Sequence, residues 1–254
     1  MGNILEVKNL SVEFKKDKKP FFAVSDVSFD VKEGEILGLA GESGCGKSSL
    51  SRAILGIQKK GVTGSVKHFA KRPQMVFQDP AGSLNPSEKI EFILEEPIKV
   101  KGHFDKEERK RRVRDMLKKV DLDEEILDRY PHELSGGMAR RVLLCCALMD
   151  SPRLIIADEP TPGLDLDLAV RALADFREFA NAGGGVMLIT HDIELALQVA
   201  DRVAVFKDGT IIEETGVESF RSPDTLQHPF TKALWHALPE HGFCAEFTGS
   251  DCAC

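Results

Sequence analysis

The segment GESGCGKSS, residues 41–49, places three glycines, a lysine and three serines directly after the apolar run ILGLA at 36–40. Its spacing fits G-x-x-x-x-G-K-[ST], a pattern in which backbone N–H groups turn inward around a chain of phosphates. Lys47 is expected to reach the β- and γ-phosphates, and the Ser48 hydroxyl is a candidate Mg²⁺ ligand. The candidate nucleotide-binding loop comprises Gly41, Glu42, Ser43, Gly44, Cys45, Gly46, Lys47, Ser48 and Ser49.

Two neighbouring carboxylates at the end of another apolar run offer complementary chemistry. RLIIADEP, residues 153–160, ends its apolar part at Asp158, which is expected to hold Mg²⁺ together with Ser48. Glu159 follows directly, where its carboxylate can polarise an attacking water. The pattern predicts hydrolysis of a nucleoside triphosphate, with Lys47 and Glu159 as catalytic residues.

Alternating strands and helices must position these groups. The short apolar runs at 36–40, 74–78, 153–158 and 186–190 are typical of strands buried on both faces, and helices are expected at 48–57 and around Leu173, Phe176 and Phe179. This alternation favours an α/β fold with a mainly parallel sheet.

Antiparallel β structure is expected at two further places. Residues 4–15 and 21–32 alternate apolar and polar side chains on either side of KKDKKP, which predicts a pair of strands joined by an exposed turn. Asp208-Gly209 lies between two β-like runs and predicts a hairpin.

Residues 85–150 are rich in helix formers, and the run KEERKRRVRD at 106–115 is typical of a solvated helix face. We therefore expect one nucleotide-binding domain over residues 1–240, with an inserted helical subdomain at about 85–150 and a cysteine-bearing tail at 241–254.

Composition narrows the class of protein. The 254 residues carry a net charge of -7, which argues against a nucleic-acid partner. No apolar run approaches the length of a membrane span, and the N-terminus lacks the pattern of a signal peptide, so we expect a cytoplasmic location that permits docking on a membrane protein. Cys145 and Cys146 lie in the run VLLCCALM and are expected to be small buried side chains of a helix.

Four further motifs, in this order, resemble those of the ATP-binding-cassette (ABC) ATPases. QDP at 78–80 resembles the Q-loop, LSGGM at 134–138 the signature, Leu164-Asp165 the D-loop and Thr190-His191-Asp192 the switch-histidine loop. The set covers nearly the whole chain and is highly specific. It implies a P-loop ABC ATPase core with a mainly parallel sheet, an N-terminal antiparallel β subdomain and an inserted helical subdomain.

The resemblance implies that two cassettes pair head to tail with two ATP molecules between them. Gln78 would then sense Mg²⁺ and the attacking water, and His191 would contact the γ-phosphate. Phe21 or Phe22 is the candidate for stacking on adenine, and either could instead belong to the core. The signature would act on the partner's ATP through Leu134, Ser135, Gly136, Gly137 and Met138.

Three segments resemble the oligopeptide, dipeptide and nickel importer ATPases: FQDPAGSLNP at 77–86, YPHELSGGM at 130–138 and HPFTKALWHALPE at 228–240. They imply an ATP-hydrolysing subunit of a binding-protein-dependent importer for peptides, nickel or a related small solute, peripheral on the cytoplasmic face of the cell membrane. The implied partners are a second ABC ATPase, with a heterodimer favoured over a homodimer, two transmembrane permease subunits and an extracytoplasmic solute-binding protein.

A soluble ABC ATPase of DNA repair or translation is the alternative. The step of 88 positions from Lys47 to Ser135 contains no sustained heptads, which disfavours a DNA-repair ATPase with an inserted coiled coil. The chain has one cassette, which disfavours a translation-associated ABC protein. A catalytically inactive cassette is disfavoured by the intact Lys47, Asp158, Glu159 and His191.

The sequence departs from the family pattern at three places. Arg140 stands where glutamine is usual after the signature, and Pro162-Gly163 precede the D-loop. The step of 31 residues from Lys47 to Gln78 is short, which predicts that part of the intervening β structure is trimmed.

The tail HGFCAEFTGSDCAC contains Cys244, Cys252 and Cys254. Three thiolates are one fewer than the usual four ligands of an iron–sulfur cluster or structural zinc, and His241, Asp251 or a partner chain could complete a site. We favour a flexible tail with exposed thiols over a metal site.

Overall fold

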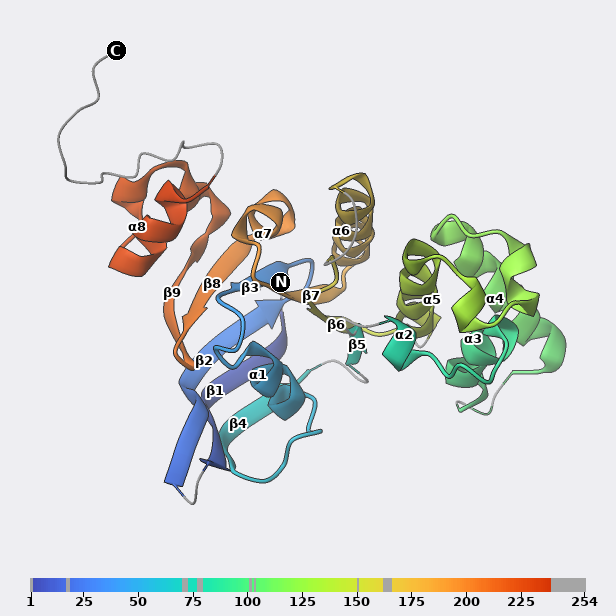
Figure 1. Ribbon diagram of the computed structural model, residues 1–254, viewed down its shortest axis with the longest axis horizontal. Coiled ribbons are helices and arrows are strands. Elements are labelled where there is room, and N and C mark those ends of the chain that lie inside the picture. Colours follow the sequence, from blue (N-terminus) through green and yellow to red (C-terminus); the bar gives the residue numbers. More distant parts are fainter. Residues whose placement is uncertain are drawn as a thin grey trace, which may run out of the picture.

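Two β-sheets organise the protein in the computed structural model, which describes residues 2–16, 19–69, 73–76, 80–100, 102, 104–149, 151–161 and 166–238. Within these residues one sheet has the strand order β2-β1-β4 and the other the order β5-β6-β7-β3-β8-β9. In Figure 1 helices α2 to α5 form a separate group to the right of the sheets, next to β5 and β6. The predicted α/β architecture, with its antiparallel and helical parts, is confirmed.

The larger sheet is parallel except for its last strand, β9, which runs antiparallel to β8. Every residue of β3, β6 and β7 is buried, which explains why their sequences are continuous apolar runs. The predicted strands are confirmed as β3 (Ile36–Ala40), β5 (Gln74–Val76), β6 (Leu154–Asp158), β7 (Gly185–Thr190), β8 (Arg202–Lys207) and β9 (Thr210–Gly216).

Each face of this sheet has its own core. Leu37 and Leu39 pack with α1 (Lys47–Ile54) and with the antiparallel sheet, whereas Ile36 and Ala40 belong to the core on the other side. That second core also takes in α6 (Leu166–Asn181), α7 (Ile193–Val199) and α8 (Pro229–His236). The helix predicted at 48–57 is shorter than expected, because Gly56 turns the chain with a φ of 69°.

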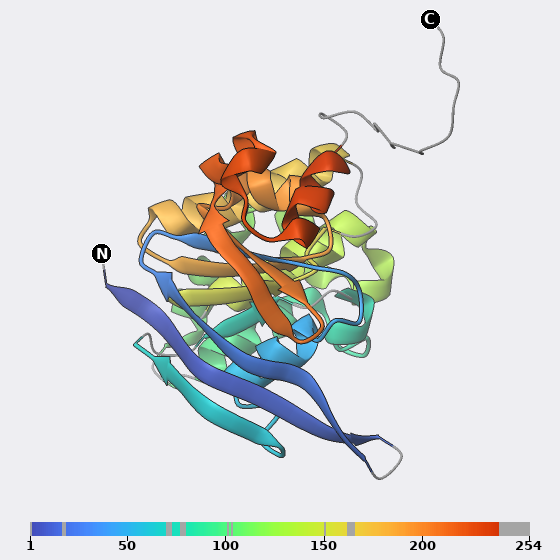
Figure 2. The ribbon, with the colours of Figure 1, turned by 90° about the vertical axis from the view of Figure 1, so that its left-hand side faces the viewer.

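The antiparallel sheet contains β1 (Asn3–Lys16), β2 (Lys19–Lys32) and β4 (Val62–His68). Figure 2 shows it as a twisted ribbon beneath the larger sheet. The predicted strand pair is confirmed, but it extends further into KKDKKP than expected, since Lys16 pairs with Lys19 through the backbone. Between α1 and β5, β4 is the single strand in the described residues, in line with the trimmed β structure that we predict.

The helical part follows β5 and contains α2 (Pro80–Ser83), α3 (Ile90–Lys99), α4 (Lys106–Lys119) and α5 (Gly136–Met149), with 3₁₀ turns at Glu124–Asp128 and Pro131–Glu133. In α4 only Val113 and Leu117 are buried, so its charged run is indeed a solvated face. Cys145 of α5 is fully buried, and burial raises the pKa of its thiol. Two more 3₁₀ turns, Val217–Arg221 and Pro223–Thr225, precede α8. None of the helices in the described part of the chain combines the length and the apolar composition that crossing a membrane requires.

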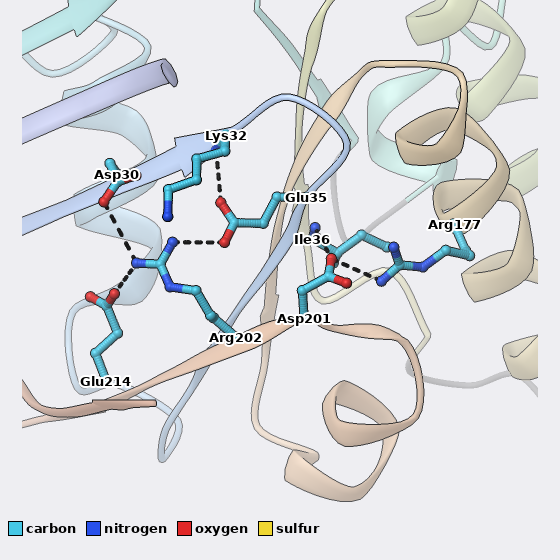
Figure 3. Close-up of polar contacts among 8 residues, drawn as sticks. All are labelled: Asp30, Lys32, Glu35, Ile36, Arg177, Asp201, Arg202 and Glu214. Carbon is cyan, nitrogen blue, oxygen red and sulfur yellow. Dashed lines mark hydrogen bonds and ion pairs between the residues drawn. The ribbon is translucent and has the colours of Figure 1, made fainter. Parts of the chain in front are cut away.

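Ion pairs and hydrogen bonds of charged side chains connect the ends of neighbouring strands (Figure 3). Arg202 at the start of β8 donates to Glu35 Oε1 at 2.7 Å and also contacts Glu214 and Asp30. Asp201 Oδ2 accepts from the Ile36 backbone N–H at 2.7 Å. The network joins β2, β3, β8 and β9 at the amino end of β3, whereas the glycine-rich loop follows its carboxyl end.

Candidate active site

The glycine-rich loop lies between β3 and α1, as predicted. Lys47 is 6% exposed, and its ammonium donates to the carbonyl oxygens of Gly41 at 2.7 Å and Glu42 at 2.8 Å. The loop therefore wraps around its own lysine. The ammonium is held at the first turn of α1, where the positive end of the helix dipole also attracts an anion.

Two glycines of the loop are required by close backbone contacts. Gly46 has a φ of 114°, and a Cβ there would lie 2.0 Å from the carbonyl oxygen of Ala23. A Cβ on Gly41 would lie 2.2 Å from the carbonyl oxygen of Phe206. The loop is thus pressed against β2 on one side and β8 on the other, and no larger residue fits at either position.

Asp158 forms the floor of the site at the carboxyl end of β6. It is 7% exposed, and its Oδ1 has no hydrogen-bond partner among the described residues. Burial raises the pKa of Asp158, although a hydrogen bond with Ser48 and the charges of Lys47 and Arg52 oppose the shift. A buried carboxylate with a spare oxygen beside a hydroxyl is a donor set that suits Mg²⁺.

Glu159 adopts an uncommon backbone conformation. Its φ is 50°, in the left-handed region, and its N–H donates to the carbonyl oxygen of Ile189 at 2.9 Å. Such conformations cost of order 1 kcal/mol or more and often mark functional sites. The turn directs the Glu159 carboxylate to His191, whose Nδ1 donates to Glu159 Oε2 at 2.8 Å.

His191 is positioned by the turn between β7 and α7. Thr190 Oγ1 accepts from the Asp192 N–H at 3.0 Å, and Asp192 Oδ1 caps α7 by accepting from the Leu195 N–H at 3.1 Å. Because Nδ1 is bonded to the carboxylate, Nε2 is left to face a ligand.

These elements enclose one cavity of about 310 Å³. Every residue that lines it belongs to the predicted site, and together they are Ser43, Gly44, Gly46, Lys47, Ser48, Ser49, Asp158, Glu159 and His191. Gln78, Leu164 and Asp165 lie outside the described residues, as do Cys244, Cys252 and Cys254 of the tail. Cys45 is half-buried, and burial raises the pKa of its thiol, which lowers its reactivity.

The signature residues do not line this cavity. Ser135 caps α5, with its Oγ accepting from the Met138 N–H at 3.3 Å, and Gly136 is exposed at the helix N-terminus. Figure 1 places α5 in the helical part, on the far side of β6 from α1. Arg140 is 8% exposed, so this departure from the family pattern affects the packing of α5 rather than the exposed signature surface.

The two candidate phenylalanines are not core residues. Phe21 is 52% and Phe22 51% exposed, on β2 immediately before Ala23, whose carbonyl oxygen abuts Gly46. Phe14 on β1 pairs with Phe21 and is 37% exposed. Exposed aromatic side chains beside the phosphate loop are available to stack on a base.

One support of the loop was not foreseen from the sequence. Asp208 and Gly209, with φ values of 49° and 83°, form the predicted hairpin turn between β8 and β9. The Gly209 N–H donates to the carbonyl oxygen of Cys45 at 3.1 Å. The hairpin signal was present in the sequence, but its contact with the phosphate loop depends on the strand order of the sheet.

Comparisons with known proteins agree with this geometry. Residues 24–162 match the family described as "ABC transporter". The chain is 40% identical over 260 residues to the dipeptide transport ATP-binding protein DppD of Haemophilus influenzae, across 93% of this chain and 78% of the relative. It is 39% identical over 263 residues to the oligopeptide transport ATP-binding protein OppF of the same organism, across 93% and 78% respectively. A dimeric ATP-binding cassette solved in a post-hydrolysis state with ADP and Pi is similar with a TM-score of 0.76 at 28% identity, over 84% of this chain and 98% of that one.

Proposed function

The chain belongs to the ATP-binding cassettes of the ABC transporter family, and we propose that it hydrolyses ATP to drive the import of peptides, nickel or a related small solute. The observation that carries this proposal is that Lys47, Asp158, Glu159 and His191 meet around one cavity, although 144 positions separate the first from the last. The relatives named for dipeptide and oligopeptide transport favour a peptide as the solute.

Lys47 and the loop would bind the phosphates of ATP. The ammonium is already fixed by two carbonyl oxygens, so little side-chain freedom is lost when a phosphate binds. The backbone N–H groups of the loop and the N-terminus of α1 add further donors. Phe21 or Phe22 would stack on the adenine.

Ser48, Asp158 and Gln78 would hold Mg²⁺. When bound, the ion offsets negative charge that builds up on the phosphates during hydrolysis. Asp158 suits this role because its buried Oδ1 lacks a partner among the residues that the structure describes.

Glu159 and His191 would orient and activate the attacking water. Glu159 Oε2 accepts from the Nδ1–H of His191, and the imidazolium form would donate its Nε2–H to a γ-phosphate oxygen. The other carboxylate oxygen of Glu159 would then accept a proton from the water.

A second cassette would complete the site. Ser135, Gly136 and Gly137 begin α5 away from the cavity of their own chain, and their hydroxyl and N–H groups are suited to the γ-phosphate held by a partner. Leu164 and Asp165 would form the D-loop between the two sites. The further partners would be two permease subunits and an extracytoplasmic solute-binding protein, with the chain peripheral on the cytoplasmic face of the membrane and a heterodimer favoured over a homodimer.

Replacing Glu159 by glutamine tests the chemistry. In the complex purified from gently solubilised membranes, Glu159→Gln is expected to lower ATP turnover by roughly 10²- to 10⁴-fold while ATP binding persists. Glu178→Gln, an exposed change on α6, serves as the control and should keep parental turnover.

Unchanged turnover in Glu159→Gln would contradict the role assigned to this carboxylate. Mass spectrometry of the co-purifying proteins tests the transport role separately. Permeases, a second cassette and a solute-binding protein are expected. DNA or ribosomal partners in their place would refute import and leave the ATPase chemistry intact.

A further inference from the structure

The segment HPFTKALWH at 228–236 is fixed to the sheet at its first turn. Glu213 of β9 accepts from the backbone N–H groups of Gln227 at 2.7 Å and His228 at 2.9 Å. Burial disfavours the charged carboxylate, but these donors outweigh it, and the pKa of Glu213 lies below its ordinary value. His228 Nδ1 then caps α8 by accepting from the Phe230 N–H at 3.1 Å. The position of Phe230 relative to β9 is therefore set by three hydrogen bonds.

Phe230 contacts the last residue of β8. The Lys207 ammonium lies 4.1 Å from the centre of the Phe230 ring, within the range of a cation–π interaction. Phe230 also packs against the core on that face of the sheet, and this packing restricts the position of its ring. The contact holds β8 at the point where the chain enters the Asp208-Gly209 turn.

The turn in its own right supports the phosphate loop. The Gly209 N–H donates to Cys45 of the loop at 3.1 Å, and the Gly209 carbonyl oxygen accepts from Ser25 of β2 at 2.7 Å. The carbonyl oxygen of Phe206, next to Lys207, also abuts Gly41. A shift of this hairpin end would move the Cys45 carbonyl and, with it, the N–H groups that surround a phosphate.

We propose that Phe230 and Lys207 are positioning residues for nucleotide binding, through which α8 sets the geometry of the phosphate loop. In Figures 1 and 2, α8 lies beside β8 and β9, and the contact of Phe230 with Lys207 connects it to the hairpin end that bonds the loop. The inference rests on the proposed nucleotide-binding role of the loop. It goes beyond that role, since it assigns the segment HPFTKALWH a function at a site whose cavity this segment does not line.

The test compares nucleotide affinity with fold stability in the full chain. Titration with a fluorescent ATP analogue in the presence of Mg²⁺ gives Kd, and thermal unfolding gives Tm. Phe230→Leu, which keeps apolar volume but loses the aromatic face, is expected to weaken binding roughly three- to tenfold. Phe230→Tyr retains the face and should bind as the parent does.

Two further variants separate positioning from general packing. Phe220→Leu makes the same substitution at a buried position of the same core and should lower Tm without changing Kd. Lys207→Met should weaken binding as Phe230→Leu does, and the double variant Lys207→Met/Phe230→Leu should be no weaker than either single variant, because both remove one contact.

Parental affinity in Phe230→Leu would overturn the inference, as would equal weakening by Phe230→Tyr and Phe230→Leu, or equal weakening by Phe220→Leu. These outcomes leave the proposed function standing, because the parent would still bind the analogue. A parent chain that fails to bind the analogue would refute both.

Discussion

Removing the charge of Arg202 is expected to lower the stability of the fold by about 2–3 kcal/mol, although Arg202 does not line the nucleotide cavity. Its guanidinium meets three carboxylates, those of Glu35, Glu214 and Asp30 (Figure 3). Burial disfavours the charged guanidinium, but the hydrogen bonds to Glu35 and Glu214 outweigh it and raise the pKa of Arg202. Arg202→Met keeps the length of the side chain and removes the charge.

The burial of Glu35 determines how much stability the Arg202→Met variant loses. Removing one partner of a fully buried ion pair costs about 3–5 kcal/mol, because the other charge is left without a partner. Glu35 is 7% exposed, but its Oε2 would keep the bond from the Lys32 N–H at 2.7 Å, which reduces the cost. Asp30 and Glu214 retain 29% and 26% side-chain exposure, so water can partly replace the contact that each loses.

Thermal unfolding followed by circular dichroism measures this cost. For a chain of this size Arg202→Met should lower Tm by roughly 5–10 °C. Adding Glu35→Gln should recover much of the loss, since the buried charge is then gone. Arg153→Met is the matched control, because Arg153 pairs with Glu33 at the surface with side-chain exposures of 53% and 39%, and it should cost less than about 1 kcal/mol.

Equal Tm values for Arg202→Met and Arg153→Met would refute the reasoning. So would additive losses in the Arg202→Met/Glu35→Gln double variant, because the argument assigns most of the cost to an uncompensated Glu35.

Two further predictions concern the loop and a titrating group on α6. Gly46→Ala should weaken ATP binding at least tenfold in the analogue titration, because its Cβ would collide with the Ala23 carbonyl oxygen. Gly44→Ala, whose Cβ would meet nothing within 4 Å, should weaken binding less. Equal losses in the two variants would contradict the close contact with Ala23. Burial and the charge of Glu178 raise the pKa of Asp175 to about 6. The folded state therefore keeps a proton that the unfolded state has already released at lower pH. The free energy of unfolding falls as pH rises towards 6, because the folded state must then carry the buried charge. Asp175→Asn should therefore raise Tm at pH 7.5 by a few degrees and leave it nearly unchanged at pH 4, and a Tm that does not respond at pH 7.5 would contradict this assignment.

The sequence predicts an element of the fold well where a local residue pattern has a single structural explanation. Ile36–Ala40 and Gly185–Thr190 are buried on both faces, and only an apolar run satisfies such a position. The β4 strand was missed because it has no buried residue, and its sequence VTGSVKH carries no apolar period. Its pairing with β1 is a backbone property that side-chain patterns do not record.

The composition of the cavity could also be predicted, but its internal contacts could not. The spacing of the loop and the acidic pair at 158–159 identify all of the lining residues except His191, which the family resemblance implies. The bond from His191 to Glu159 depends on β6 and β7 being neighbours and on the left-handed conformation of Glu159, neither of which has a sequence signal. The contact of Gly209 with Cys45 likewise follows from β8 lying beside β3.

The separation of the signature from the cavity determines how much of the proposed reaction one chain can perform. Ser135 Oγ accepts the bond that caps α5, so its O–H can still donate to a phosphate, and Gly136, at the exposed start of that helix, offers a surface with no side chain in the way. A γ-phosphate bound between Lys47 and His191 would therefore find donors from its own chain on one side only. If the signature of a second cassette supplies the other side, ATP must hold the two chains together, and cleavage of the γ-phosphate removes the group that both chains share. Hydrolysis by Glu159 would then open the dimer, and this is the step through which a cassette without a membrane-spanning helix in its described residues could drive transport by permease partners.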